Sequence, residues 1–158
     1  MKVQVRQGVF ETNSSSTHSM TVSKTSDYEA FKNGKMWAML TYSSDDDIIL
    51  LPEAEAIEYN IKQLKDRNCD EGFINTYREK KNFWEAFSSK YSEDDETQYD
   101  DWESFKDEYE LDSCSEYYMS WEDFWDGECM QTYEQFSRNI VSEHGDKITV
   151  WGYYGNDY

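Results

Sequence analysis

A short polar stretch near the amino terminus contains the residue types of nucleophilic catalysis. It reads E-T-N-S-S-S-T-H-S, from Glu11 to Ser19. A serine becomes a nucleophile when a histidine removes its proton and a carboxylate orients that histidine. A histidine, a glutamate and three serines in this stretch could fill those roles. The candidate catalytic residues are His18, Glu11, Ser14, Ser15 and Ser16.

The same stretch also has the composition of an ordinary turn. Asn13 tolerates a left-handed backbone, and Ser and Thr side chains satisfy turn backbone groups. The backbone could also cradle a phosphate, but the glycines and lysine of a phosphate-binding loop are missing. The sequence contains neither a G-x-S-x-G nor an H-E-x-x-H motif. We therefore predict a structural loop at residues 13–18, with a small enzyme or nucleotide-binding site as the alternative.

The negative charge of the chain is concentrated in one segment. The net charge is −19, and residues 91–128 account for −15 of it, with 16 acidic residues and one basic residue, Lys106. Only 26 of the 158 residues are Leu, Ile, Val or Phe, a composition that approaches disorder. However, 13 Tyr and 6 Trp supply apolar area, since each large aromatic side chain buries roughly 150–250 Å². We expect one folded domain over residues 1–158 with an aromatic core.

Two predicted helices in this segment, at residues 99–110 and 120–128, have rings on one face and carboxylates on the other. Trp102, Phe105 and Tyr109 share a face of the first helix, and Trp121 and Trp125 share a face of the second. Like charges three or four residues apart destabilise a helix, so the acidic faces are favoured when a basic partner covers them. The candidate partner-binding residues are Asp100, Asp101, Glu103, Asp107, Glu108, Glu110, Glu122, Asp123 and Asp126.

Such a face can imitate a nucleic-acid strand. Phosphates lie about 7 Å apart along each strand of duplex DNA, and carboxylates three or four residues apart on a helix start about 5–6 Å apart at Cβ and can splay further. We therefore expect the acidic helices to occupy an Arg- and Lys-lined groove of a nucleic-acid-binding protein, with no direct contact to nucleic acid. The alternative is an acidic surface that binds nothing basic and only adds solubility.

The hydrophobic pattern predicts an α+β fold. Strands are expected at residues 3–10, 18–24, 35–42 and 148–154, with a short strand or helix lead-in at 48–51. Helices are expected at 28–32, from Pro52 to a break at Asn68, and at 73–91 and 129–145. Residues 1–51 and 146–158 should then form a small, mostly antiparallel sheet. Residues 52–145 should form a mainly helical insert that contains the acidic segment 91–128.

Several classes of protein and site are not indicated by the sequence. The three cysteines form no CxxC or Cys/His cluster, so neither a disulfide framework nor structural zinc is expected. We predict no metal site and no cofactor. The longest aliphatic run, residues 48–51, is too short to cross a bilayer, and no signal peptide is indicated, so we expect no membrane partner.

The run R-Q-G-V-F-E-T-N-S-S-S-T-H-S, from Arg6 to Ser19, resembles an N-terminal motif of small proteins from phages and bacterial mobile elements. The match covers 14 of the 158 residues. The resemblance implies a protein of the bacterial cytoplasm. It also implies an anti-defence role for the acidic helices, such as anti-CRISPR inhibition of a host nuclease, by analogy of class. A virion or assembly protein is a further alternative.

Overall fold

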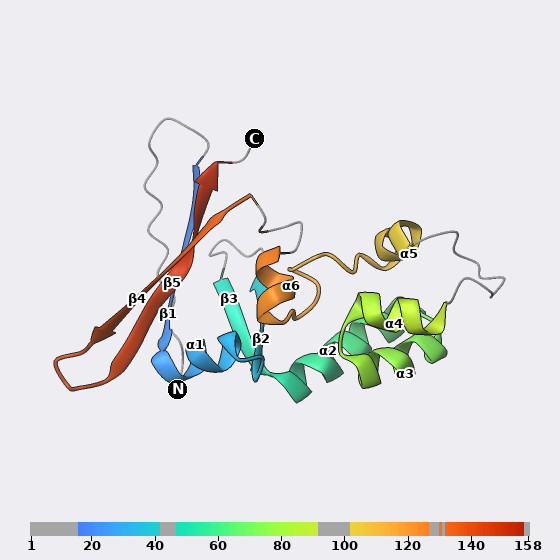
Figure 1. Cartoon of the computed structure of the whole chain (residues 1–158), viewed down its shortest axis with the longest axis horizontal. Helices are drawn as coiled ribbons and strands as arrows, with labels where there is room; N and C mark the ends of the chain where they lie inside the picture. Colours follow the sequence, from blue (N-terminus) through green and yellow to red (C-terminus); the bar gives the residue numbers. More distant parts are fainter. Residues whose placement is uncertain (1–15, 42–46, 92–101, 127–129, 131, 157–158) are drawn as a thin grey trace.

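The computed structural model describes residues 16–41, 47–91, 102–126, 130 and 132–156. This part of the chain contains five strands and six helices, whose arrangement is drawn in Figure 1. In chain order they are β1 (Ser16–Lys24), α1 (Thr25–Lys32), β2 (Met36–Thr41), β3 (Asp47–Pro52), α2 (Glu53–Asp66), α3 (Glu71–Lys80), α4 (Phe83–Lys90), α5 (Trp102–Tyr109), α6 (Trp121–Asp126), β4 (Glu134–Val141) and β5 (Lys147–Asn156).

The predicted α+β class is confirmed, and strands from near both ends of the chain pair with each other. β5 lies between β1 and β4, antiparallel to both, with Ser16 opposite Asn156 and Lys24 opposite Ile148. β2 and β3 form a separate two-stranded antiparallel sheet. Figure 1 shows the three-stranded sheet at one end of the molecule, α2 to α5 at the other, and β2, β3 and α6 between them.

The helix predicted at residues 129–145 is wrong, because residues 134–141 form strand β4. Tyr133, Phe136 and Ile140 have the spacing of a helical face, but Phe136 and Ile140 also suit a strand that alternates with polar residues. The neighbouring strand decides between the two, since β5 places Gly152 opposite Phe136 and Ile148 opposite Ile140. Backbone pairing with a distant strand therefore overrides the local pattern.

The helix predicted at residues 73–91 is two helices, α3 and α4. Lys81 has a left-handed backbone with φ of 61°, which ends α3. Asn82 then caps α4, because its side-chain oxygen accepts a hydrogen bond from the Glu85 N–H at 3.0 Å. Residues 48–51 belong to strand β3. The strand predicted at residues 3–10 lies outside the described residues.

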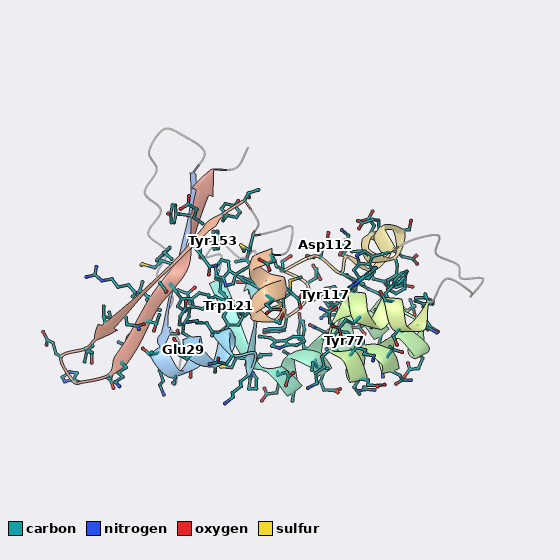
Figure 2. The ribbon with its side chains drawn as sticks, in the orientation of Figure 1. Glu29, Tyr77, Asp112, Tyr117, Trp121 and Tyr153 are labelled. Carbon is teal, nitrogen blue, oxygen red and sulfur yellow. The ribbon has the colours of Figure 1, made fainter. Side chains whose placement is uncertain are left out.

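Strand β2 is shared by two aromatic cores. Its alternate side chains point to opposite faces, so Trp37 and Met39 pack among α2 to α5, while Ala38 and Leu40 pack among α1, α6 and β5. Figure 2 shows Tyr77 and Tyr117 in the first core and Trp121 and Tyr153 in the second. The rings predicted to replace aliphatic residues thus form both cores. Their largest fully buried members are Trp151, Tyr77, Tyr117, Phe31, Phe73, Phe105 and Phe124.

Gly152 is required where β5 passes β1. A Cβ atom at this position would overlap the backbone carbonyl of Ser19, and backbone atoms cannot move aside as a flexible side chain can. We expect Gly152→Ala to lower the free energy of unfolding by about 2 kcal/mol, the cost of an overpacked site. Urea denaturation measures this change. Ser137→Ala, at an exposed position on the neighbouring strand, should change it by less than about 0.5 kcal/mol. Equal stabilities for the two variants would contradict the close approach.

Candidate partner-binding surface

Helix α5 has the two faces that the sequence predicts. Phe105 and Tyr109 are buried in the helical core, and Trp102 packs against it. Asp107 and Glu108 are exposed on the other side. The ring face therefore anchors the helix and leaves its carboxylates directed at solvent.

Lys106, the one base between residues 102 and 126, does not reach this surface as a free charge. Its side chain pairs with Glu103 at 2.9 Å and with Asp112 at 3.6 Å, and the residue is only 8% exposed. Two carboxylates therefore already neutralise the only positive group in the sequence between 102 and 126. Nine acidic residues share the same stretch, so its outer surface is strongly negative.

Helix α6 repeats the arrangement in a shorter form. Phe124 and Trp125 are buried, whereas Glu122 and Asp126 are exposed. Ser120 caps the helix by accepting a hydrogen bond from the Asp123 N–H at 3.2 Å, and its hydroxyl donates to the Asp123 carboxylate at 2.8 Å. The Asp123 carboxylate thus accepts a hydrogen bond from the residue that caps its own helix.

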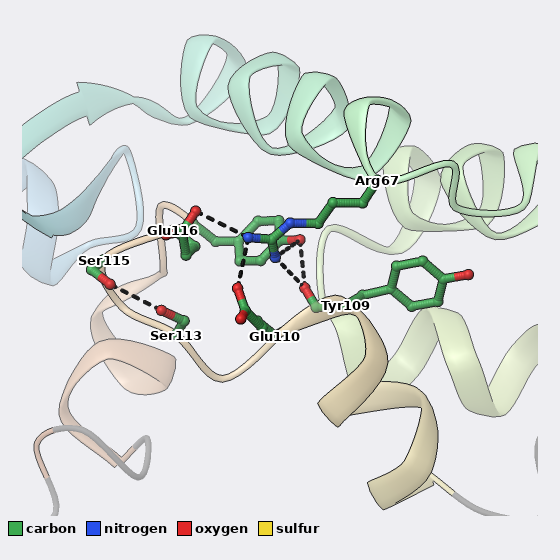
Figure 3. Close-up of polar contacts among 7 residues, drawn as sticks. Arg67, Tyr109, Glu110, Ser113, Ser115 and Glu116 are labelled. Carbon is green, nitrogen blue, oxygen red and sulfur yellow. Dashed lines mark hydrogen bonds and ion pairs between the residues drawn. The ribbon is translucent and has the colours of Figure 1, made fainter.

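Arg67, just after α2, binds the segment that follows α5. Its guanidinium donates to the backbone carbonyl of Tyr109 at 2.6 Å and to the Tyr117 hydroxyl at 3.1 Å. It also pairs with Glu110 at 2.7 Å and with Glu116 at 3.1 Å. Figure 3 shows these contacts converging on one side chain. Glu110 has φ of 52° and follows the end of α5, and the side chain of this predicted partner-binding residue is 60% exposed but held by Arg67.

Arg67 and Tyr117 each keep one protonation state near neutral pH. Burial by itself lowers the pKa of Arg67, but Tyr117, Glu110 and Glu116 outweigh it and leave the pKa raised. Burial raises the pKa of Tyr117 to about 12, against the opposing effect of Arg67. Tyr117 therefore remains a neutral hydroxyl, which donates to the Tyr109 carbonyl at 2.7 Å. The cation stays available to hold both carboxylates.

Asn60, in the middle of α2, provides a second attachment for the same segment. Its amide donates to the Tyr118 carbonyl and to the Tyr77 hydroxyl, each at 2.8 Å, and its oxygen accepts from the Tyr118 N–H at 2.8 Å. Asn60 is fully buried, and both amide hydrogens and the oxygen have partners. Both backbone polar groups of Tyr118 are therefore satisfied inside the core.

The predicted partner-binding residues divide into three groups. Four are exposed and form no ion pair with any other described residue; these outward carboxylates are Asp107, Glu108, Glu122 and Asp126. Three are engaged within the molecule, namely Glu103, Glu110 and Asp123. The remaining two, Asp100 and Asp101, lie outside the described residues. The outward carboxylates are thus the part of the predicted set that is available to a partner.

A pocket of about 280 Å³ lies beside the acidic helices, and no pattern in the sequence predicts it. Trp84 and Trp102 line it together with Asp112 and Asp126. The predicted helix at 73–91 places Trp84 on the buried face, but the break at Lys81 turns the helix and leaves Trp84 53% exposed. The left-handed residue that redirects this ring carries no local sequence signal, because lysine rarely adopts that conformation.

The loop predicted at residues 13–18 is wrong over residues 16–18, which belong to β1. In this strand the backbone of His18 pairs with that of Tyr154 in β5. Glu11, Ser14 and Ser15 lie outside the described residues. Across the described ranges, no three His, Cys, Asp or Glu side chains lie close enough together to hold a metal ion. In the same ranges, no helix combines the length and hydropathy needed to cross a membrane.

The Asn60 attachment can be tested by removing its side chain. Asn60→Ala leaves the N–H and C=O of Tyr118 without partners, and each unsatisfied buried group costs about 1–3 kcal/mol. We expect the free energy of unfolding in urea to fall by about 3 kcal/mol. Asn75→Ala, at an exposed position on α3, should change it by less than about 0.5 kcal/mol. A loss at Asn60 no greater than that at Asn75 would show that the attachment is not needed.

Comparison of the chain with protein-family models, with curated proteins and with solved structures gives no significant match. The function therefore has to be argued from the chemistry of the surface itself.

Proposed function

We propose that the chain is a non-enzymatic, phage-type anti-defence inhibitor that mimics nucleic acid. Its outward carboxylates enter the basic DNA- or RNA-binding groove of a host nuclease, such as a CRISPR effector. The observation that carries the proposal is the burial of Lys106 in a segment with nine acidic residues between positions 102 and 126, four of which pair with Lys106 or Arg67. The base that could offset this negative charge is already held by Glu103 and Asp112.

The energetics of the acidic helices support a basic partner. The aromatic rings of α5 and α6 pack these helices onto the two cores. Glu110 and Glu103 pair with Arg67 and Lys106, so these two acids have a structural role. Nothing in that packing needs the outward carboxylates, which repel one another. A basic groove would remove this repulsion, and the field of the surface would steer association over long range in a salt-dependent way.

The buried thiol of Cys69 does not supply a catalytic nucleophile. Burial raises the pKa of Cys69 to about 12, and the thiolate, not the thiol, is the nucleophile. Cys69 is 7% exposed within the helical core, so it behaves as a packing residue.

Removing the outward carboxylates tests the proposal. The variant Asp107→Asn, Glu108→Gln, Glu122→Gln, Asp126→Asn keeps side-chain size and changes the net charge by four. We expect the parent chain to displace labelled duplex DNA from at least one of a panel of purified CRISPR effector nucleases. The variant should lose about tenfold or more in potency, because basic groups of the groove would lose their charged partners and association would be slower. Raising the salt concentration from about 50 to 200 mM should weaken binding of the parent chain to the nuclease, as it weakens the binding of nucleic-acid phosphates.

A matched control removes four charges elsewhere. Glu55→Gln, Asp66→Asn, Glu71→Gln and Glu79→Gln alter exposed acids on α2 and α3 and give the same net charge. This control should retain potency within about twofold, since the contact depends on position and not on total charge. Equal losses in the two variants, or no inhibition across the panel, would overturn the proposal.

A further inference from the structure

The pocket beside the acidic helices has walls made of aromatic rings. Trp84 at the start of α4 and Trp102 at the start of α5 both line it, with ring centroids 5.6 Å apart and planes at 72°. Trp37, Tyr77 and Tyr118 are buried residues that also line it. Trp84 is 53% exposed, although an indole is one of the most favourable groups to bury. A ring left open to solvent beside a cavity is available to a ligand.

The charges around this pocket favour a cation. Three aspartates line it, Asp112, Asp123 and Asp126, together with two lysines. Both lysines are already paired, Lys81 with Glu53 at 3.0 Å and Lys106 with Glu103 at 2.9 Å. Three aspartates thus line the pocket beside two lysines whose charges are each balanced by a glutamate. An anionic ligand such as a nucleotide would meet a net negative field here.

Asp126 connects the pocket to the outward carboxylates, since it belongs to both. Asp123 is engaged by the Ser120 hydroxyl at 2.8 Å and by the Asn82 amide at 3.3 Å. Asp126 is exposed and forms no ion pair with another described residue. The pocket therefore combines electron-rich rings with one carboxylate that has no base of its own in the described part of the chain.

The size and chemistry of the pocket select the kind of group that fits. A volume of about 280 Å³ is at the lower end of small-molecule pockets, which suits a single side chain. A guanidinium stacks flat on an indole and donates in a fork to a carboxylate, whereas an ammonium is more strongly hydrated and has no flat face. Arginine is also the basic residue most enriched at the centre of interfaces.

We propose that this pocket binds an arginine side chain of the basic partner, with the guanidinium stacked on Trp84 and paired with Asp126, while Trp102 packs edge-to-face against Trp84. The inference rests on the proposed function, because it names the group by which a basic groove is recognised. The outward carboxylates then supply long-range attraction, and the pocket supplies the specific anchor at the edge of the same surface.

The test uses two short peptides, Ac-GGRGG-amide and Ac-GGKGG-amide, titrated into the full chain and followed by the indole N–H resonances of Trp84 and Trp102. We expect the arginine peptide to bind about fivefold to tenfold more tightly than the lysine peptide, within the range of a cation–π contact. Trp84→Leu and Asp126→Asn should each weaken arginine binding by about fivefold. Both positions are exposed, and Glu55→Gln, an exposed acid on α2 outside the pocket, should have no effect.

The outcomes separate this inference from the proposed function. Equal binding of the two peptides, absence of binding, or unchanged binding to Trp84→Leu would overturn the arginine pocket. The proposed nuclease inhibition would still be tested separately, by the variants that replace carboxylates with amides. Selective arginine binding in a chain that inhibits no nuclease would keep the pocket and overturn the proposed target. In the nuclease assay, Trp84→Leu changes no charge, so a loss of potency there would support the anchor specifically.

Discussion

The backbone between α5 and α6 has to be buried without leaving its polar groups unpaired. Water cannot reach Tyr117, Tyr118 or Met119, and an unpaired buried N–H or C=O costs as much as a lost hydrogen bond. The molecule satisfies them with partners far away in the sequence. Asn60 pairs with Tyr118, and Ala38 of β2 exchanges hydrogen bonds of 2.9 and 2.8 Å with Met119. The acidic helices depend on this arrangement, because the segment is the link between them.

The same segment explains why β2 can be buried on both faces and at both edges. β3 pairs with one edge, and on the other the Leu40 N–H donates to the Cys114 carbonyl at 2.7 Å, beside the Ala38–Met119 pair. Partners at both edges allow a strand to enter the centre of a protein, because buried N–H and C=O groups need hydrogen bonds. The side chains of β2 pack into both the helical core and the core under the three-stranded sheet. The positions of the two cores are therefore coupled through this strand.

Local pattern was enough to predict the elements whose packing is local. The rings at Trp102, Phe105 and Tyr109 repeat at helical spacing, and α5 forms as expected. Elements that depend on distant partners could not be predicted in this way. Strand β4 depends on β5, the orientation of Trp84 depends on the left-handed Lys81, and the internal ion pair of Glu110 depends on Arg67, which lies 43 residues earlier. No local pattern encodes those partners.

The carboxylates of the acidic region have separate tasks. Glu103, Glu110 and Glu116 hold Lys106 and Arg67 in place, whereas the outward carboxylates contribute nothing to the folded core. Exposed positions without internal partners tolerate substitution with small changes in stability. In evolutionary terms, the proposed recognition surface can therefore change independently of the scaffold. A lineage that has to follow a changing partner could redraw the pattern of negative charge on α5 and α6 while the fold beneath it stays the same.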